Sequence, residues 1–171
     1  MARVVVLVEG ESDAVVVRRL LSGRGQDPEV VVAMGGVTNV RRHAEELRAG
    51  GADPVLLALG DVGERRYLEK VEPPLAGVFL CDRDLEEELF RALGRDQVLE
   101  AIAAIGDEER WATFCGQPEW RDRPVDDQLR RFVGTRSGRK AALADELGRR
   151  LRPGAEPPPL VALLDGVARY G

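Results

Sequence analysis

The sequence predicts an α/β protein, with a parallel four-stranded sheet flanked by helices and a helical C-terminal half. Four short apolar runs have the composition of buried parallel strands. Segments in which apolar residues recur at helical spacing separate these runs, as expected when parallel strands are joined by helical crossovers. After the fourth run the pattern is helical throughout. The four runs are residues 4–8, 30–34, 54–59 and 77–80.

The helices of the first half follow from the same spacing. A helix is expected over residues 13–22, where apolar side chains recur on one helical face. A second helix, capped at Thr38 or Asn39, should run to Leu47 and stop at a pair of glycines. Residues 61–70 form a shorter helical or loop segment that closes before two prolines.

The second half contains several further helical patterns. Asp84 is expected to cap a helix that ends at Gly94, and Asp96 to cap the next one. Two more helices are expected in PVDDQLRRFVG and SGRKAALADELGRRL, and a last one in PLVALLDGVARYG. A stiff proline-rich linker, RPGAEPPP, precedes the last helix.

These patterns predict one domain with an extension. Residues 1–151 form the domain, with the α/β core over about residues 1–94, and residues 152–171 form the linker and a final helix that packs on the same domain. Binding of a second copy, and thus a homodimer, is the other role open to this helix. The 171 residues, 44% of them hydrophobic, suit one compact core.

Composition excludes several classes of protein. No stretch approaches the roughly 20 apolar residues of a membrane helix, and the N-terminus lacks the features of a signal peptide. The two cysteines form neither a zinc-type pair nor a disulfide framework. A cytoplasmic protein without membrane contact is therefore expected, and Met1 favours a natural start.

Charge is unevenly distributed along the chain. Residues 121–152 hold ten basic and five acidic residues, and because the whole chain has a net charge of −5, the remainder carries −10. This asymmetry is compatible with a metal site beside a phosphate-binding surface. Ordinary solvated helix faces are an equally good explanation from charge alone.

Carboxylates follow three of the predicted strands. Glu9 ends the first strand and Asp13 follows four residues later, and Asp61 follows the third strand. The fourth strand ends at Asp82 and leads into Asp84 and Glu86. Ligands bind at the carboxyl ends of parallel strands, and carboxylates gathered there repel one another unless cations intervene. Oxygen ligands of this kind suit Mg²⁺ or Mn²⁺. For any single carboxylate, helix capping is the simpler explanation.

Other catalytic motifs find little support. His43 is the sole histidine and lies on a polar helix face, which disfavours a histidine-centred triad or a zinc site. GTRSGRKAA lacks the spacing of a Walker loop, and GGVTN is better explained as a turn before a helix than as a dinucleotide fingerprint.

Several motifs together resemble the TOPRIM domain, a Rossmann-like fold shared by topoisomerases, primases and OLD-family nucleases. These are VVLVEGESD, the strand ending at Asp61, MGGVTN, CDRDLEEELFRALG and GTRSGRK, and the pattern looks most like the OLD type. The resemblance extends to about Leu151. It implies a divalent-metal-dependent nuclease that cleaves or nicks DNA by a two-metal mechanism.

The resemblance also implies roles for individual residues. Glu9 and Asp13 match the metal-binding EGxxD pair, and Asp61 matches the first acid of the family's DxD motif. Glu86 matches the acid of the DLE element. Lys140 matches a late lysine that assists cleavage by neutralising charge or relaying a proton, with Glu9 as the other catalytic residue.

The chain departs from the family pattern in two ways. Position 63, where the second acid of DxD belongs, is Gly63, and Glu64 is the nearest substitute ligand. OLD proteins also carry an ATPase domain before the TOPRIM part, so a separate ATPase partner is one expectation. Two alternatives to a DNA nuclease stay open: an RNA-processing nuclease or nucleotidyl transferase at the same site, and a degenerate, non-catalytic binding module, which Gly63 favours.

Overall fold

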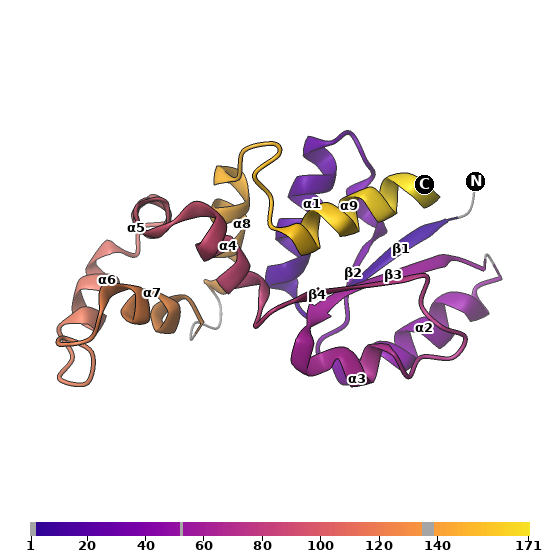
Figure 1. The fold of residues 1–171 in the computed structure, drawn as a ribbon, viewed down its shortest axis with the longest axis horizontal. Helices are drawn as coiled ribbons and strands as arrows, with labels where there is room; N and C mark the ends of the chain where they lie inside the picture. The colour runs from indigo at the N-terminus through magenta and orange to yellow at the C-terminus, as the bar shows by residue number, and fades with distance from the viewer. Residues whose placement is uncertain (1–2, 52, 135–138) are drawn as a thin grey trace.

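In the computed structural model, which describes residues 3–51, 53–134 and 139–171, a four-stranded parallel sheet lies between two layers of helices (Figure 1). The strand order is β2-β1-β3-β4. The bounds of the strands are β1 Val4–Val8, β2 Val31–Ala33, β3 Val55–Asp61 and β4 Gly77–Cys81. The predicted parallel sheet is therefore confirmed, with strand ends within two residues of those expected.

The helices alternate with the strands in the first half and follow one another in the second. The first half contains α1 Glu11–Gly23, α2 Val40–Ala49 and α3 Arg65–Leu68, with short 3₁₀ turns η1 Pro28–Val30, η2 Val37–Asn39 and η3 Val62–Glu64. The second half contains α4 Leu85–Leu93, α5 Arg95–Ala104, α6 Glu108–Cys115, α7 Val125–Gly134, α8 Lys140–Arg150 and α9 Pro158–Tyr170.

Both faces of the sheet are buried because side chains alternate along each strand. On β1, Val4, Val6 and Val8 face the layer that contains α1, α8 and α9. Val5 and Leu7 face the other layer, formed by α2 and α3. This two-sided burial explains why β1 is a continuous apolar run rather than an alternating pattern.

The terminal helix α9 returns to the sheet and covers part of one face (Figure 1). Leu160, Leu163, Leu164 and Val167 are buried there among side chains of β3 and β4. Beside it, α1 packs against α8, and Arg19 on α1 forms a two-pronged ion pair with a carboxylate of α8. The second half is thus attached to the sheet directly through α9, and to α1 through α8.

The helical half differs from the sequence prediction at two points. The expected cap at Asp96 is wrong: α5 begins directly at Arg95 after Gly94, whose positive φ of 77° ends α4 and turns the chain into α5. Helix α6 was not predicted, because its buried side, carrying Trp111 and Phe114, is too short for a clear apolar period. Within the described residues, no helix is long and apolar enough to cross a membrane.

Candidate functional site

A pocket of about 370 Å³ opens at the carboxyl edge of the sheet, between the ends of β1, β3 and β4 and helices α1, α4 and α8. Register places Asp61 of β3 beside Cys81 of β4, so the acidic segments after these strands start at one level. The five expected metal ligands and the expected catalytic lysine all line this pocket: Glu9, Asp13, Asp61, Glu64, Glu86 and Lys140.

Asp13 serves its own helix and the pocket at the same time. Its Oδ2 accepts a hydrogen bond of 3.0 Å from the amide of Gly10, which caps the start of α1. Burial, and after it the charge of Glu86, raises the pKa of Asp13 to about 6, although the Gly10 amide acts in the opposite direction. A carboxylate has two oxygens, so the cap leaves Oδ1 of Asp13 available to a ligand.

Asp61 and Glu64 form a reciprocal capping box at the end of β3. Oδ1 of Asp61 accepts from the amide of Glu64 at 2.9 Å, and Oε2 of Glu64 accepts from the amide of Asp61 at 3.1 Å. Burial is the main cause that raises the pKa of Glu64 to about 7, and the charge of Glu9 acts in the same direction. The side chain of Glu64 is thus held in the pocket by a local turn.

Glycine at position 60 makes room for this arrangement. A Cβ atom on Gly60 would lie 2.8 Å from Oε2 of Glu64 and 2.9 Å from Cδ1 of Leu68, too close for either contact. Gly63, the expected position of the second DxD acid, is exposed, and a Cβ there would lie 3.1 Å from Oδ1 of Asp61. The carboxylate that the pocket receives from this turn is therefore that of Glu64.

Glu86 of α4 and Lys140 of α8 approach each other at the pocket. Glu86 lies in the first turn of α4 with 8% of its surface exposed, and the Nζ of Lys140 is 2.8 Å from its Oε1. Apart from this ammonium, the buried Oε1 of Glu86 has no hydrogen-bond partner in the described part of the chain. Burial lowers the pKa of Lys140, but the bond and charge of Glu86 outweigh it, so the pKa is raised and the ammonium is charged at neutral pH.

Lys140 occupies the first position of α8 and follows Arg139, and residues 135–138 of the GTRSGRK motif lie outside the described residues. Arg139 reaches into the helical half, where its Nε is 3.1 Å from Oδ2 of Asp107 and its guanidinium also donates to the carbonyl of Ile105. Asp107 is 2% exposed. This ion pair ties the start of α8 to the turn between α5 and α6, and thereby positions Lys140.

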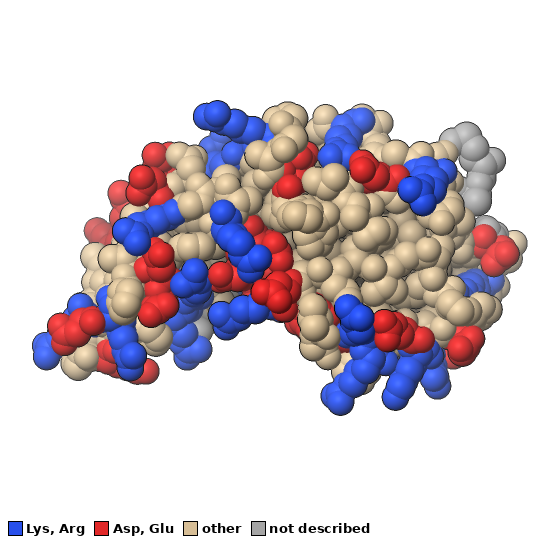
Figure 2. Space-filling model, viewed as in Figure 1, with Lys and Arg blue, Asp and Glu red and all other residues tan. Residues whose placement is uncertain are grey.

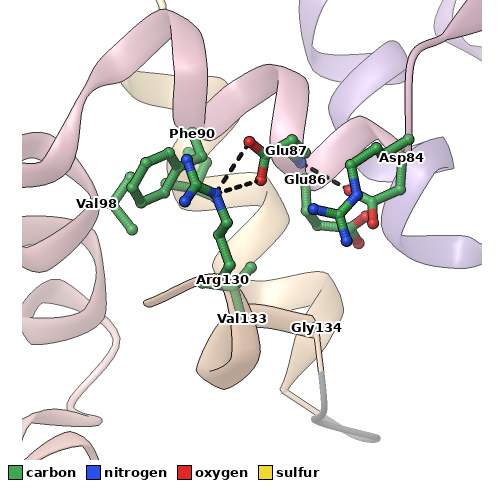
Figure 3. Close-up of a pocket in the computed structure, with 10 residues that line it drawn as sticks. Asp84, Glu86, Glu87, Phe90, Val98, Arg130, Val133 and Gly134 are labelled. Carbon is green, nitrogen blue, oxygen red and sulfur yellow. Dashed lines mark hydrogen bonds and ion pairs between the residues drawn. The ribbon is translucent and has the colours of Figure 1, made fainter. Parts of the chain in front are cut away.

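Asp84 is a lining residue that the sequence interpretation assigned to capping alone. Its Oδ1 does cap α4, accepting from the amide of Glu87 at 2.7 Å, as predicted (Figure 3). The same side chain also lines the pocket. Asp84 is the first residue of the DLE element, which ends at Glu86. This position was the sequence signal that could have identified Asp84 as a residue of the site. Asp82 is exposed and does not line the pocket; its carboxylate lies 3.7 Å from Arg91.

The pocket supplies the oxygen donors that hard divalent cations prefer. All are carboxylates, and Glu86 offers a buried oxygen. Asp13 and Glu64 have raised pKa values, mainly because they are buried and to a lesser extent because other carboxylates lie nearby. In the described part of the chain, no three Asp, Glu, His or Cys side chains are placed to ligate one ion together. Four carboxylates of the pocket accept hydrogen bonds from capping amides, and Glu86 pairs with Lys140, so side-chain rotation would accompany cation binding.

The fold that carries this pocket is the TOPRIM-like fold found in the C-terminal region of OLD proteins. The C-terminal region of the Burkholderia pseudomallei OLD protein superposes with a TM-score of 0.67 at 17% identity, covering 99% of this chain and 98% of that one. The corresponding region of the Xanthomonas campestris pv. campestris OLD protein gives 0.69 at 22% identity, covering 99% and 95%. No protein-family model and no curated protein matches the sequence.

Proposed function

We propose that this protein is a divalent-metal-dependent nuclease that cleaves or nicks DNA. The observation that carries the proposal is the pocket itself, in which acidic side chains following three separate strands meet the ammonium of Lys140. Carboxylates for cations beside one fixed positive charge are the parts that phosphodiester cleavage requires. The shared fold of OLD C-terminal regions supports a nuclease on independent grounds.

The cofactor in this proposal is Mg²⁺ or Mn²⁺, held by Glu9, Asp13, Asp61, Glu64 and Glu86. Glu9 is the exposed member of this set, and its carboxylate has no hydrogen bond or ion pair in the described part of the chain. A bound divalent cation supplies charge neutralisation at the scissile phosphate and a more acidic water. Glu86 can pair with Lys140 through one carboxylate oxygen and bind the cation through the other.

Lys140 has an electrostatic role in this proposal. Its ammonium lines the pocket at its junction with the helical half, where a phosphate group entering the pocket would contact it. A fixed positive charge there stabilises the additional negative charge that develops on the phosphate oxygens in the transition state. Glu9, the unpaired carboxylate, is the group available to orient or deprotonate an attacking water.

Nicking of supercoiled plasmid in Mg²⁺ or Mn²⁺ tests the proposal. Glu9→Ala is expected to reduce the rate at least about 100-fold, because it removes a carboxylate of the site. Glu11→Ala is the matched control: Glu11 lies two residues away, is exposed, and pairs with Arg18 at 2.7 Å outside the pocket. Equal metal-dependent nicking by wild type and Glu9→Ala, or none by wild type, would contradict the proposal.

A non-catalytic binding module is the second candidate, and Gly63 is the residue that favours it. Calorimetric titration with Mn²⁺ separates the two functions. If the protein is a nuclease, the wild type is expected to bind Mn²⁺ and Asp61→Ala to abolish this binding. A binding module need not hold the ion.

A further inference from the structure

A groove lined by arginines lies beside the carboxylate pocket in the helical half of the molecule. It encloses about 1010 Å³ between the start of α4 and helix α7 with the turn that precedes it. Four of its lining residues are arginines, one is a tryptophan and two are aspartates, so its charge is net positive. The lining residues are Arg83, Asp84, Trp120, Arg123, Asp127, Arg130, Arg131 and Gly134.

Two of these arginines are available to a ligand. Arg83 and Arg123 are exposed, and neither forms an ion pair with any acidic residue of the described chain. Arg130 is held differently: it pairs with Glu87 at 2.9 Å and lies 5.1 Å from the centre of the Phe90 ring (Figure 3). The groove therefore combines a fixed guanidinium with two that form no ion pair within the described chain.

Trp120 adds an aromatic surface to the groove. One face of its indole stacks on Phe114, with ring centres 5.2 Å apart, and the side chain is only half-buried. Phe114 in turn contacts Phe132 in the core of the helical half, which holds the pair in place. Arginines that follow a backbone, together with a rigid aromatic ring, are the features of single-strand binding surfaces.

The groove is continuous with the carboxylate pocket. A second pocket of about 440 Å³ lies between them; it shares Asp84 and Glu86 with the carboxylate pocket and Arg83, Asp84 and Arg130 with the groove. Its floor is apolar and nearly buried, formed mainly by residues of α4, α5, α7 and α8 (Figure 3). Figure 2 shows acidic side chains next to basic ones around the hollow between the two halves of the molecule.

We propose that the groove containing Arg83, Arg123 and Trp120 binds a single strand of DNA and leads it to the carboxylate pocket. The arginines contact phosphates, and Trp120 stacks against a base. The groove is a concave surface with an aromatic wall at one side, which suits an unpaired strand better than the wide convex surface of a duplex. That the bound strand is then cut rests on the proposed nuclease function; the binding itself does not.

The test is fluorescence anisotropy with a labelled oligothymidine of about 16 nucleotides, in metal-free buffer so that no cleavage occurs. Arg83→Ala/Arg123→Ala is compared with Arg152→Ala/Arg169→Ala, which removes the same charge from exposed positions at and after the linker. The groove variant is expected to bind at least about 10-fold more weakly. The slope of log Kd against log salt concentration should decrease by about 1.4, because two phosphate contacts are lost. The control variant should bind like wild type.

Three results would overturn the inference. Equal weakening in both double variants would mean that general charge attracts the strand. Unchanged binding in the groove variant would place the strand elsewhere. A duplex of the same length that binds as tightly as the single strand would show that the groove does not select an unpaired strand. Circular dichroism of both variants checks that the fold is retained.

A second readout follows Trp120 itself. The chain has two tryptophans, so a Trp111→Phe protein reports on Trp120 alone. Oligothymidine is expected to quench its fluorescence through stacking, and unchanged fluorescence at saturation would refute the role of Trp120. Plasmid nicking without these binding effects would refute the groove alone, whereas groove binding without nicking would refute the nuclease alone.

Discussion

The carboxylate pocket and the arginine groove lie side by side, carry opposite charge and are built in different ways. The acidic side chains of the pocket follow directly from strand ends, and Asp13, Asp61 and Asp84 also cap the turn or helix that comes next. The arginines of the groove come from a loop, a turn and one helix, and nothing in local geometry requires them. Local backbone structure thus organises the pocket, while packing of the helical half organises the groove.

Lys140 is the basic residue that the helical half contributes to the pocket, so its removal is the strongest test of the comparison. Lys140→Ala is expected to reduce nicking about 100-fold, because a fixed charge beside the phosphate is lost, and to leave Mn²⁺ affinity within a few-fold of wild type. Plasmid nicking and calorimetry measure the two effects.

The matched control is Lys70→Ala, since Lys70 is the other lysine of the chain and is exposed. A loss of Mn²⁺ binding that parallels the loss of nicking would show that Lys140 belongs to the architecture of the pocket and not to its chemistry.

Asp107 tests whether the helical half positions Lys140. Asp107→Asn is expected to destabilise the protein by about 2 kcal/mol, because it leaves Arg139 without its charged partner at a site where Asp107 is buried. Urea unfolding measures this loss, and the nicking rate should fall at the same time.

Asp126→Asn removes an ion pair of 2.7 Å with Arg95 on the surface of the same half, and should leave the unfolding midpoint nearly unchanged. Similar losses in both variants would refute a special role for the buried pair.

Variants at Glu64 and Gly63 test whether Glu64 takes the place of the second acid of the DxD motif. Glu64→Gln is expected to weaken Mn²⁺ binding about 10-fold, whereas Gly63→Asp should not strengthen it, because a side chain at 63 would crowd Asp61 instead of entering the pocket. Calorimetric titration of both variants measures the affinities. Tighter binding by Gly63→Asp would mean that the acid missing from position 63 limits the site.

Raised carboxylate pKa values make the metal-free pocket a source of pH-dependent instability. The pKa of Glu64 in the folded protein is about 7, above its unfolded value of 4.5, so the folded state takes up the proton first as pH falls. The free energy of unfolding should therefore increase by about 1 kcal/mol as the pH falls from 8 to 5. This increase is smaller than the pKa shift alone implies, because solvent reaches the pocket.

Thermal unfolding in EDTA measures this dependence. Glu64→Gln should reduce it, whereas Glu69→Gln, an exposed position near Arg65, should keep it. An identical pH dependence in all three proteins would contradict the raised pKa of Glu64.

Sequence reasoning predicted most of the α/β half, for reasons that are local. Buried parallel strands have continuous apolar runs, and β1, β3 and β4 each end at or beside the acidic residue that was singled out. Asp84 capped its helix as expected, but an N-cap assignment excluded it too early from the site. A carboxylate can cap with one oxygen and line a pocket with the rest of its side chain.

The helical half was predicted less well. Helix α6 was missed and the start of α5 was misplaced, because short helices with mixed polarity carry weak periodic signals. The excess of positive charge after residue 121 was visible in the sequence. It could not distinguish arginines that form ion pairs within the fold, such as Arg150 with Glu146, from arginines that line the groove.

The sequence alone thus determined the parallel sheet and the carboxylates at its edge, since strand periodicity and turn chemistry act over a few residues. Only the tertiary structure decided that Lys140 reaches Glu86 and that Arg83 and Arg123 share one groove. Lys140 and Glu86 lie more than fifty residues apart in the chain. Contacts over such distances arise from the packing of helices against the sheet, which no local pattern specifies.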